Sequence, residues 1–435
     1  MADSRRSFIR KGSLYLLTLI FMMSIPVRKG KRMIARAAAK EPGKRKPAAK
    51  KTSSRQHVAV EPCASYDTDT VYRSLVKALE AIGFRAPSGK KVLLKPNIIA
   101  QNTPDQSATT HPAVVDAVCR YFTEHGCSVS IGDSSAFYQG GGTAEAFEKT
   151  GMAAVAKKYG ARLIPFETTT LCACTDGKYL NPLYISNAVY EHDLVVNLPK
   201  LKVHRLARYT GAIKNVFGCI SGGTKWLYHT IYQHRSDYQE IWGKPLVDVY
   251  EAVSPRLSVL DAVIGLDKDG PQATGEPRFT GLLLASTSGP ALDVVACRII
   301  GYEPRRVPAV REALDRGLAA EDMITVHGSV PLIPYQKRPD LQTSTGFMRK
   351  AEDYFFGQIM VTPRIELKKC TKYGVCVRDC APAAIRWNAK RLPVIDYKKC
   401  IYCYCCENYC AFDAIHLHGG AVNHLIRGMR YLFKV

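Results

Sequence analysis

Apolar runs alternate with amphipathic stretches through the middle of the chain. Short apolar runs bounded by turn residues predict strands, whereas apolar positions three and four residues apart predict helices. Strands that alternate with helices in this way are typical of an α/β domain with a mostly parallel sheet, which we place at residues 58–335. The expected strands are 92–94, 128–131, 162–165, 193–198, 257–266 and 282–285, and the expected helices are 71–82, 114–122 and 147–159.

Polar residues follow several of these strands directly. Ligands of parallel α/β sheets bind beyond the carboxyl ends of the strands, so these side chains are expected to converge on one cleft. Lysine at such points supplies positive charge for a phosphate or a carboxylate, and the sequence therefore predicts a small anionic ligand. Taken singly, each lysine is also compatible with a solvated strand end, and Asp261 and Asp293 with caps or turns. The ligand-binding candidates are Lys95, Asn97, His111, Lys200, Lys202 and Asn215, and the candidates for proton exchange are Asp133, His204 and Lys214.

An ordered set of short segments carries a family resemblance. Together these segments resemble the domain of unknown function 362 family, over roughly residues 58–330. The resemblance implies an α/β domain that is often joined to ferredoxin modules, and it implies no particular substrate. The segments are Leu94–Asn97, His111-Pro112, Gly132–Ser134, Gly140–Thr143, Asn197–His204, Thr210–Gly218, Gly222-Gly223 with Lys225, Asp261, Gly270-Pro271, and Ala291–Asp293.

Cysteines are concentrated near the C-terminus, where eight of the fifteen lie between Cys370 and Cys410. With Cys405 set aside, the run Cys400-x2-Cys403-x2-Cys406-x3-Cys410 has the spacing of a bacterial ferredoxin site for a 4Fe–4S cluster. A degenerate copy lies upstream and carries Tyr373 where a second cysteine is expected. The doubled motif resembles bacterial ferredoxins, which implies a small α+β iron–sulfur domain at residues 361–420.

In two-motif ferredoxins the fourth cysteine of each run ligates the other cluster. This crossed pattern gives one complete set, Cys380, Cys400, Cys403 and Cys406, for a 4Fe–4S cluster. The other set contains only Cys370, Cys376 and Cys410, which suits a 3Fe–4S cluster or a 4Fe–4S cluster with one open iron. A zinc-binding cysteine cluster, and a lost second site with Tyr373 packed over it, are the alternatives.

The N-terminus pairs Arg5 and Arg6 with Phe8-Ile9 and then an apolar stretch from Leu14 to Val27. This pattern resembles a twin-arginine export signal, and the apolar stretch is short for a bilayer span, which needs about 20 residues. An uncleaved N-terminal anchor on the cytoplasmic face is the alternative. The predicted segments are a signal or anchor at 1–37, a basic linker at 38–57, a connector helix at 336–360 and an amphipathic basic tail helix at 421–435.

The formal net charge of +23 is concentrated at the same end of the chain. Residues 1–56 hold 16 Lys and Arg against two acids and so contribute +14 of that total. A charge this localised indicates an export signal, a linker or contact with an anionic membrane surface, and no nucleic-acid motif accompanies it.

These features predict an iron–sulfur electron-transfer protein of the periplasm, or of a membrane surface facing it. We expect an oxidoreductase whose α/β domain binds a small anionic substrate or cofactor and exchanges electrons with a redox partner. The alternatives are a non-enzymatic electron carrier and an assembly or docking factor. The substrate, the direction of electron flow and any flavin are left open by the sequence.

Overall fold

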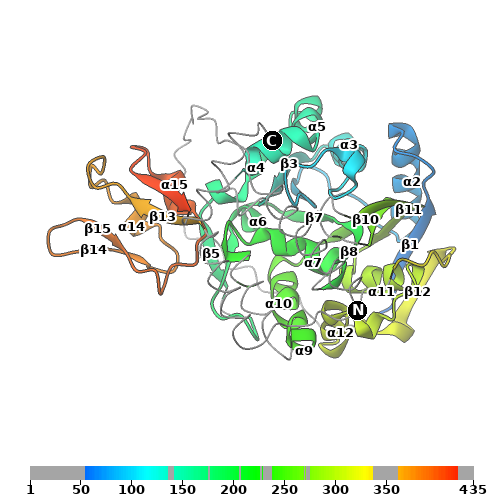
Figure 1. The fold of residues 1–435 in the computed structure, drawn as a ribbon. Coiled ribbons are helices and arrows are strands. Elements are labelled where there is room, and N and C mark those ends of the chain that lie inside the picture. Colours follow the sequence, from blue (N-terminus) through cyan, green and yellow to red (C-terminus); the bar gives the residue numbers. More distant parts are fainter. Residues whose placement is uncertain are drawn as a thin grey trace, which may run out of the picture.

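The computed structural model describes residues 54–135, 142–174, 177–204, 207–225, 228, 238–268, 270, 275–336 and 361–419. Its main body is built on one mostly parallel sheet (Figure 1), which confirms the predicted α/β class. In spatial order the strands are β12 (Ile324–Gly328), β1 (Gln56–Pro62), β11 (Glu276–Ser286), β10 (Leu257–Asp267), β7 (Leu194–Leu198), β2 (Lys91–Pro96), β3 (Ser128–Asp133) and β4 (Arg162–Pro165), with β8 (Lys200–His204) paired to β10 and β9 (Arg208–Thr210) paired to β8.

Helices cover both faces of this sheet, and each face has its own apolar core. The two cores take alternate residues of the same strands, as Leu93 and Leu94 of β2 show. On one face lie α2 (Thr68–Ala81), α3 (Pro112–Glu124), α4 (Thr143–Lys149) and α5 (Met152–Tyr159), and on the other lie α6 (Ala188–Glu191), α7 (Ala212–Asn215), α10 (Gly243–Val253), α11 (Gly289–Ile299) and α12 (Pro308–Asp315), with α9 (Tyr238–Ile241) beside α10 and α12.

The parallel pairing sets where the functional side chains lie. Strand β2 pairs in parallel with β3 and β7, and β7 pairs in parallel with β10. The carboxyl ends of these strands therefore share one edge of the sheet, and the segments that follow them meet there. The sequence predicted this convergence, although it did not predict β8, which continues from β7 as a further strand.

The structure corrects four details of the predicted elements. The helix expected at 147–159 is two helices, because Gly151 adopts a φ of +79° between α4 and α5. The predicted linker 38–57 ends too late, since β1 begins at Gln56. Strand β11 runs antiparallel to both of its neighbours, β1 and β10. Two short strands that pair only with each other were not expected, namely β5 (Leu171–Cys174) and β6 (Leu183–Ser186).

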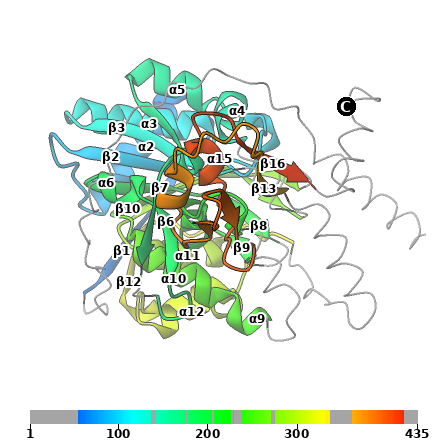
Figure 2. The same ribbon diagram turned by 90° about the vertical axis from the view of Figure 1, so that its left-hand side faces the viewer.

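Residues 361–419 form a second, smaller unit, which we call the cysteine module. It is built from two antiparallel pairs and two short helices, and it lies beside β5 at one side of the main body (Figures 1 and 2). Its elements are β13 (Val361–Ile365), α14 (Val375–Arg378), β14 (Ile385–Trp387), β15 (Pro393–Ile395), α15 (Cys405–Tyr409) and β16 (Ile415–Gly419).

Several predictions fall outside the described residues. These are the signal or anchor at 1–37, most of the linker, the connector helix apart from Gln336, and the tail at 421–435. Among the residues that are described, no helix combines the length and apolar character needed to span a membrane.

Candidate functional site

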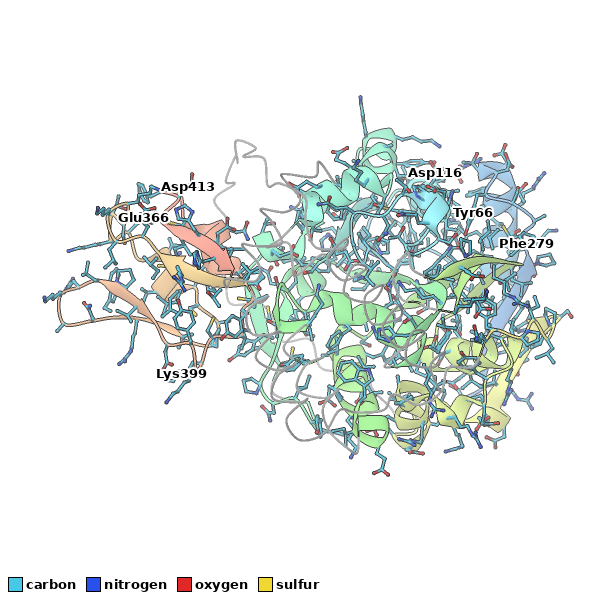
Figure 3. The ribbon with its side chains drawn as sticks, in the orientation of Figure 1. Tyr66, Asp116, Phe279, Glu366, Lys399 and Asp413 are labelled. Atoms are coloured by element: carbon cyan, nitrogen blue, oxygen red, sulfur yellow. The ribbon has the colours of Figure 1, made fainter. Side chains whose placement is uncertain are left out.

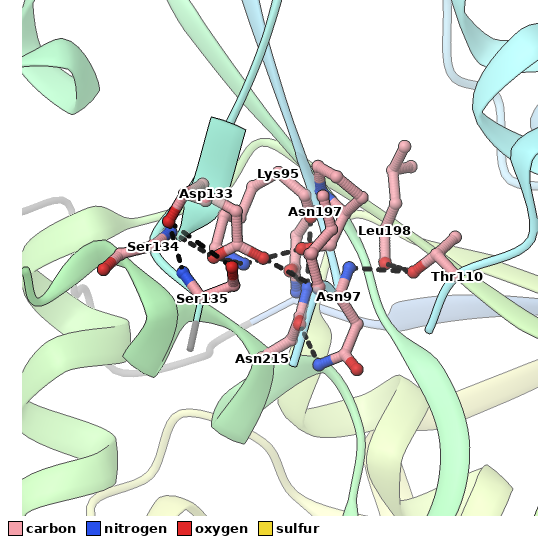
Figure 4. Close-up of polar contacts among 12 residues, drawn as sticks. Lys95, Asn97, Thr110, Asp133, Ser134, Ser135, Asn197, Leu198 and Asn215 are labelled. Carbon is pink, nitrogen blue, oxygen red and sulfur yellow. Dashed lines mark hydrogen bonds and ion pairs between the residues drawn. The ribbon is translucent and has the colours of Figure 1, made fainter. Parts of the chain in front are cut away.

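Lys95 and Asp133 form a buried ion pair at the ends of two adjacent parallel strands. The Lys95 ammonium lies 2.8 Å from the Asp133 carboxylate, and both side chains are almost fully buried (Figure 4). The same carboxylate accepts hydrogen bonds from the backbone amides of Ile98 at 2.8 Å and Ser134 at 2.7 Å. Gly218 packs so closely that an added Cβ would lie 2.4 Å from the Asp133 oxygen. Asp133 is therefore held rigidly in place.

A row of asparagines links Lys95 to the neighbouring segments. Asn97 donates to Asn215 at 2.8 Å, and Asn215 donates to Asn197, also at 2.8 Å (Figure 4). The Lys202 ammonium donates to the Asn97 side-chain oxygen at 2.6 Å. The structure thus brings together Lys95, Asn97, Lys202 and Asn215, as the sequence predicted.

Lys202 lies next to two buried hydroxyls that have no hydrogen-bond partner within the described residues. Thr210 is opposite Lys202 in the β8–β9 pair, so both side chains are on the same face. Thr109 follows Ala108, whose carbonyl accepts from Lys202 at 2.7 Å. Both hydroxyl oxygens are buried and unpartnered in this part of the chain. Because buried polar groups are nearly always paired, these two hydroxyls are candidates to pair with a polar ligand or water.

Lys214 and Lys225 add positive charge to the same region. Burial, and then the charge of Lys225, lowers the pKa of Lys214 to about 7, and the structure gives Lys214 no ion pair within the described residues. Burial also lowers the pKa of Lys225 to about 8, although Glu167 acts in the opposite direction. We call Lys95, Lys202, Lys214 and Lys225 the lysine cluster. Among the described residues, the carboxylates that act on this cluster are Asp133 and Glu167, and this excess of amines favours an anionic ligand.

Lys95, Lys202 and Lys225 are buried, and Lys214 is half-buried. The alternative that these lysines are solvated strand ends therefore does not describe them. Lys202 illustrates the cost, because burial and the neighbouring ammonium of Lys214 lower its pKa. Lysines this deeply desolvated are rarely retained without a partner or a function.

Lys200 belongs to a separate, internally satisfied group. Its ammonium lies 2.8 Å from Asp261 and 2.7 Å from the hydroxyl of Tyr66, which itself donates to Asp261. His111 stacks on Tyr66 with ring centroids 3.6 Å apart, and burial lowers the pKa of His111 to about 4. Asp261 lies within β10, so the prediction of a cap or turn was wrong. Lys200 and His111 therefore act structurally in this state.

The remaining candidates have local structural partners. The Nδ1 atom of His204 accepts a hydrogen bond from the Ala207 amide at 3.1 Å, which closes the turn between β8 and β9. Asp293 accepts from the amides of Ala212 and Ile213 and so caps α7, as predicted. Burial raises the pKa of Asp293 to about 7.

The cysteine module contains a small cavity. Six cysteines line it, namely Cys376, Cys380, Cys400, Cys403, Cys405 and Cys406, and they include the whole of the predicted complete set. Backbone amides donate to two of the sulfurs, at 3.3 Å for Cys380 and 3.4 Å for Cys400. Such N–H···S bonds stabilise thiolates and tune iron–sulfur clusters, so the cavity suits a cluster with four cysteine ligands.

The other three cysteines, Cys370, Cys376 and Cys410, lie near one another, although Cys376 also lines the cavity. Burial raises the pKa of Cys376 to about 11, and Cys410 and then Cys370 act in the same direction. The two cysteine loops repeat after 30 residues with matching backbone, as shown by φ values of 59° and 55° at Lys372 and Tyr402. Tyr373 therefore occupies the position equivalent to Cys403. It is 63% exposed and packs against Phe412.

Within the described residues, no three His, Cys, Asp or Glu side chains converge on a point suited to a single metal ion.

A glycine turn joins the cavity to the lysine cluster. The amide of Gly222 donates to the Ser134 hydroxyl at 3.1 Å, and the amide of Gly223 donates to the Tyr402 carbonyl at 2.8 Å. Ser134 follows Asp133 directly, and its carbonyl accepts from Lys225. Its hydroxyl also donates to Glu167 at 2.7 Å. The backbone beside Cys403 is thus linked to Lys225 of the lysine cluster through the glycine turn and Ser134, by three hydrogen bonds.

The sequence did not assign a role to four residues of this region, Tyr66, Thr109, Glu167 and Lys225. Glu167 is a charged residue just after the apolar strand β4, and this position is the sequence feature that could have identified it. Lys225 stands three residues after Gly222 in a segment that was noted without a role. Tyr66 and Thr109 carry no local signal, because their importance comes from contacts distant in sequence.

A family model for the domain of unknown function DUF362 matches residues 92–298. The chain belongs to this DUF362 family, since its similarity to one curated relative extends over most of that protein. The relative is the thylakoid-associated protein sll1697 of Synechocystis sp. strain PCC 6803, which is 34% identical over 250 residues. That alignment covers 57% of this chain and 75% of the relative.

Two solved structures are more distantly similar. The lactate racemase apoprotein of Thermoanaerobacterium thermosaccharolyticum has a TM-score of 0.36 and 14% identity over 57% of each chain. A protein of Thermotoga maritima has a TM-score of 0.33 and 15% identity over 59% of this chain and 60% of that one. Each comparison therefore spans less than two thirds of the solved chain.

Proposed function

We propose that this protein is an iron–sulfur oxidoreductase in which a small anionic ligand binds beside the complete cysteine set. The observation that carries the proposal is the glycine turn at Gly222-Gly223, which contacts the cysteine loop on one side and Ser134 on the other. A carrier that only passes electrons has no need for a buried lysine cluster at this point.

The cysteine cavity fits a 4Fe–4S cluster by the chemistry of its lining. Cys380, Cys400, Cys403 and Cys406 would hold the cluster, and the amides on Cys380 and Cys400 would stabilise the thiolate charge. A cluster in this position supplies one-electron transfer. The three other cysteines, Cys370, Cys376 and Cys410, are proposed to hold a 3Fe–4S cluster or a 4Fe–4S cluster with one open iron.

The lysine cluster would bind and orient the ligand. Lys202 and Lys214 supply charge to a carboxylate or phosphate, and Thr109 and Thr210 supply the unpartnered hydroxyls. Lys214 has a pKa of about 7, so it can give or accept a proton near neutral pH. Burial of the cluster excludes bulk water from the bound ligand. Asp133 holds Lys95 in position. Both of its carboxylate oxygens already accept hydrogen bonds within the described residues, so we assign it no contact with the ligand.

The test is the small molecule that the protein retains. The protein is purified without oxygen, denatured with acid and the released anions are identified by mass spectrometry. We expect a near-stoichiometric carboxylate or phosphate compound from the wild type and none from a Lys202→Met, Lys214→Met double variant. Equal release from both proteins, or no anion from either, contradicts the proposed ligand site.

Export by the twin-arginine route is proposed from the N-terminal motif. That route carries folded cargo, which suits a protein that acquires its clusters before export, and the periplasm or a membrane surface facing it follows as the location. The alternative is an uncleaved anchor with the protein on the cytoplasmic face. Fractionation of cells that express an Arg5→Lys, Arg6→Lys double variant distinguishes the two proposals. If the twin-arginine route exports the protein, this variant should stay in the cytoplasm, whereas an uncleaved anchor predicts the same fractionation as for the wild type.

A further inference from the structure

Three large aromatic side chains lie exposed together at the three-cysteine site. Tyr373 is 63% exposed, Phe412 46% and Trp387 40%. The rings of Tyr373 and Phe412 are in edge contact with centroids 5.9 Å apart. Trp387 lies over Gly374, where an added Cβ would come within 3.1 Å of its ring. We call Tyr373, Trp387 and Phe412 the aromatic patch. Grouped apolar side chains of this kind mark interaction surfaces.

The module around this patch is strongly basic at its surface. Residues 361–419 contain ten Lys and Arg against five Asp and Glu, and all ten cations are exposed. Of the five acids only Asp413 is exposed, because the others are partly covered. Figure 3 shows Lys399 and Asp413 at opposite edges of the module. Lys372 and Arg386, which adjoin Tyr373 and Trp387 in the chain, carry the positive charge to the aromatic patch.

The complete cysteine cavity faces the main body. Leu171 of β5 lines that cavity, and the glycine turn at Gly222-Gly223 contacts its loop. Among the described residues, the loop of the three-cysteine site instead carries the exposed aromatic patch. A protein partner can therefore reach the module closely on the side of Tyr373.

We infer that the aromatic patch and its basic surround are the docking face for an acidic one-electron carrier protein. This inference rests on the proposed function, since the electron would pass to or from a cluster at the three-cysteine site. One partner loses one electron and the other gains it, with no proton transferred and no covalent bond made or broken. Positive charge steers an acidic carrier to the face, and the aromatic rings supply the contact that excludes water.

The test uses a purified acidic two-iron ferredoxin of the plant type as the probe. Its affinity for the full-length protein is measured by titration calorimetry at 20 mM and 300 mM salt, for the wild type and a Lys372→Glu, Arg386→Glu variant. The matched control is Lys77→Glu with Lys157→Glu, which makes the same change of charge at exposed positions of α2 and α5. A further variant, Asp413→Asn, removes the one exposed acid beside the patch.

We expect the patch variant to bind the ferredoxin at least tenfold more weakly at low salt, the control variant to bind like the wild type, and Asp413→Asn to bind more tightly. High salt should weaken wild-type binding, because screening acts on exposed charges. Equal binding by the patch and control variants overturns the inference. The inference is also overturned if the patch variant loses binding to anionic phospholipid vesicles while its binding to ferredoxin is unchanged. That result would make the patch a membrane-binding face. Iron content of each variant is measured separately, so a failure of cluster assembly is distinguished from a failure of docking.

Discussion

The backbone amide of Gly223 donates a 2.8 Å hydrogen bond to the carbonyl of Tyr402, and this bond fixes the cysteine loop against the main body. Its neighbour Gly222 adopts a φ of +58° and lies so close that an added Cβ would be 2.5 Å from the Cys403 carbonyl. Only glycine suits both conditions. The contact therefore joins two parts of the chain that are about 180 residues apart.

Replacement of Gly222 by Ala is expected to lower the free energy of unfolding by about 2–3 kcal/mol, through a strained φ and a clash with backbone. The matched control is Gly160→Ala, where φ is +64° but no atom lies within 4 Å of the added Cβ. That control should cost about 1–2 kcal/mol, because it tests the conformation alone. Denaturant unfolding measures both, and hydrogen exchange near Tyr402 should rise only in Gly222→Ala. Equal effects in the two variants would show that the close contact is unimportant.

Anion binding is expected to weaken as pH rises through about 7. The pKa of Lys214 is lowered to about 7 by burial, so its ammonium, which attracts the anion, loses its proton above that value. The same shift means that burying the charged amine costs stability at every pH below the unfolded value of about 10.4, and most fully below 7. Lys214→Met should therefore raise the melting temperature of the ligand-free protein at pH 6, while it weakens anion binding roughly ten- to a hundredfold. A pH-independent affinity in the wild type would contradict this role of Lys214.

Lys200→Met should behave in the opposite way. It leaves Asp261 buried without its cation, and the loss of one partner of a buried ion pair costs about 3–5 kcal/mol. Tyr66 still donates to that carboxylate, so the protein is expected to fold with a much lower melting temperature. Thermal melting beside Lys214→Met checks the difference. If Lys200→Met instead melts like the wild type and only anion binding falls, Lys200 belongs to the ligand site.

Cluster type at the second site is expected to follow the residue at position 373. Air-treated wild-type protein should show the electron paramagnetic resonance signal of a 3Fe–4S cluster, because only Cys370, Cys376 and Cys410 are present. Tyr373→Cys should remove that signal and restore a 4Fe–4S cluster, since the backbone there matches that of Cys403. Tyr373→Phe is the control and should leave the signal unchanged. A change of signal in Tyr373→Phe would make the phenol oxygen an iron ligand.

The sequence predicted the elements whose signal is local. Apolar runs that alternate with helical stretches identified β2, β3, β7 and β10. Because these strands were expected to be parallel, their carboxyl ends were expected to share one edge of the sheet, with Lys95, Asn97 and Asp133 at that edge. The break between α4 and α5 was missed because Gly151 within an apolar helical pattern does not by itself reveal a positive φ. Strand β1 was not predicted at all, because a basic linker leads into it without a turn signal.

The chemistry of the site depended more on contacts distant in sequence. Lys200 and Lys202 are two residues apart in β8 and look equivalent, yet Lys200 meets Asp261 and Lys202 meets Asn97. No local pattern separates them, because the partners come from different strands. The glycine turn was equally hidden, since the need for glycine at 222 arises from a loop near residue 403.

The most direct test of the account is the electron paramagnetic resonance spectrum of the anaerobically purified, dithionite-reduced protein, recorded with iron and zinc analysis. We predict the signal of a reduced 4Fe–4S cluster in the wild type, its persistence in Cys370→Ser, and its loss or conversion in Cys403→Ser, because Cys403 belongs to the complete set and Cys370 does not. Protein that contains zinc without iron, or a signal that depends on Cys370 and is unaffected by Cys403→Ser, would contradict the central claim.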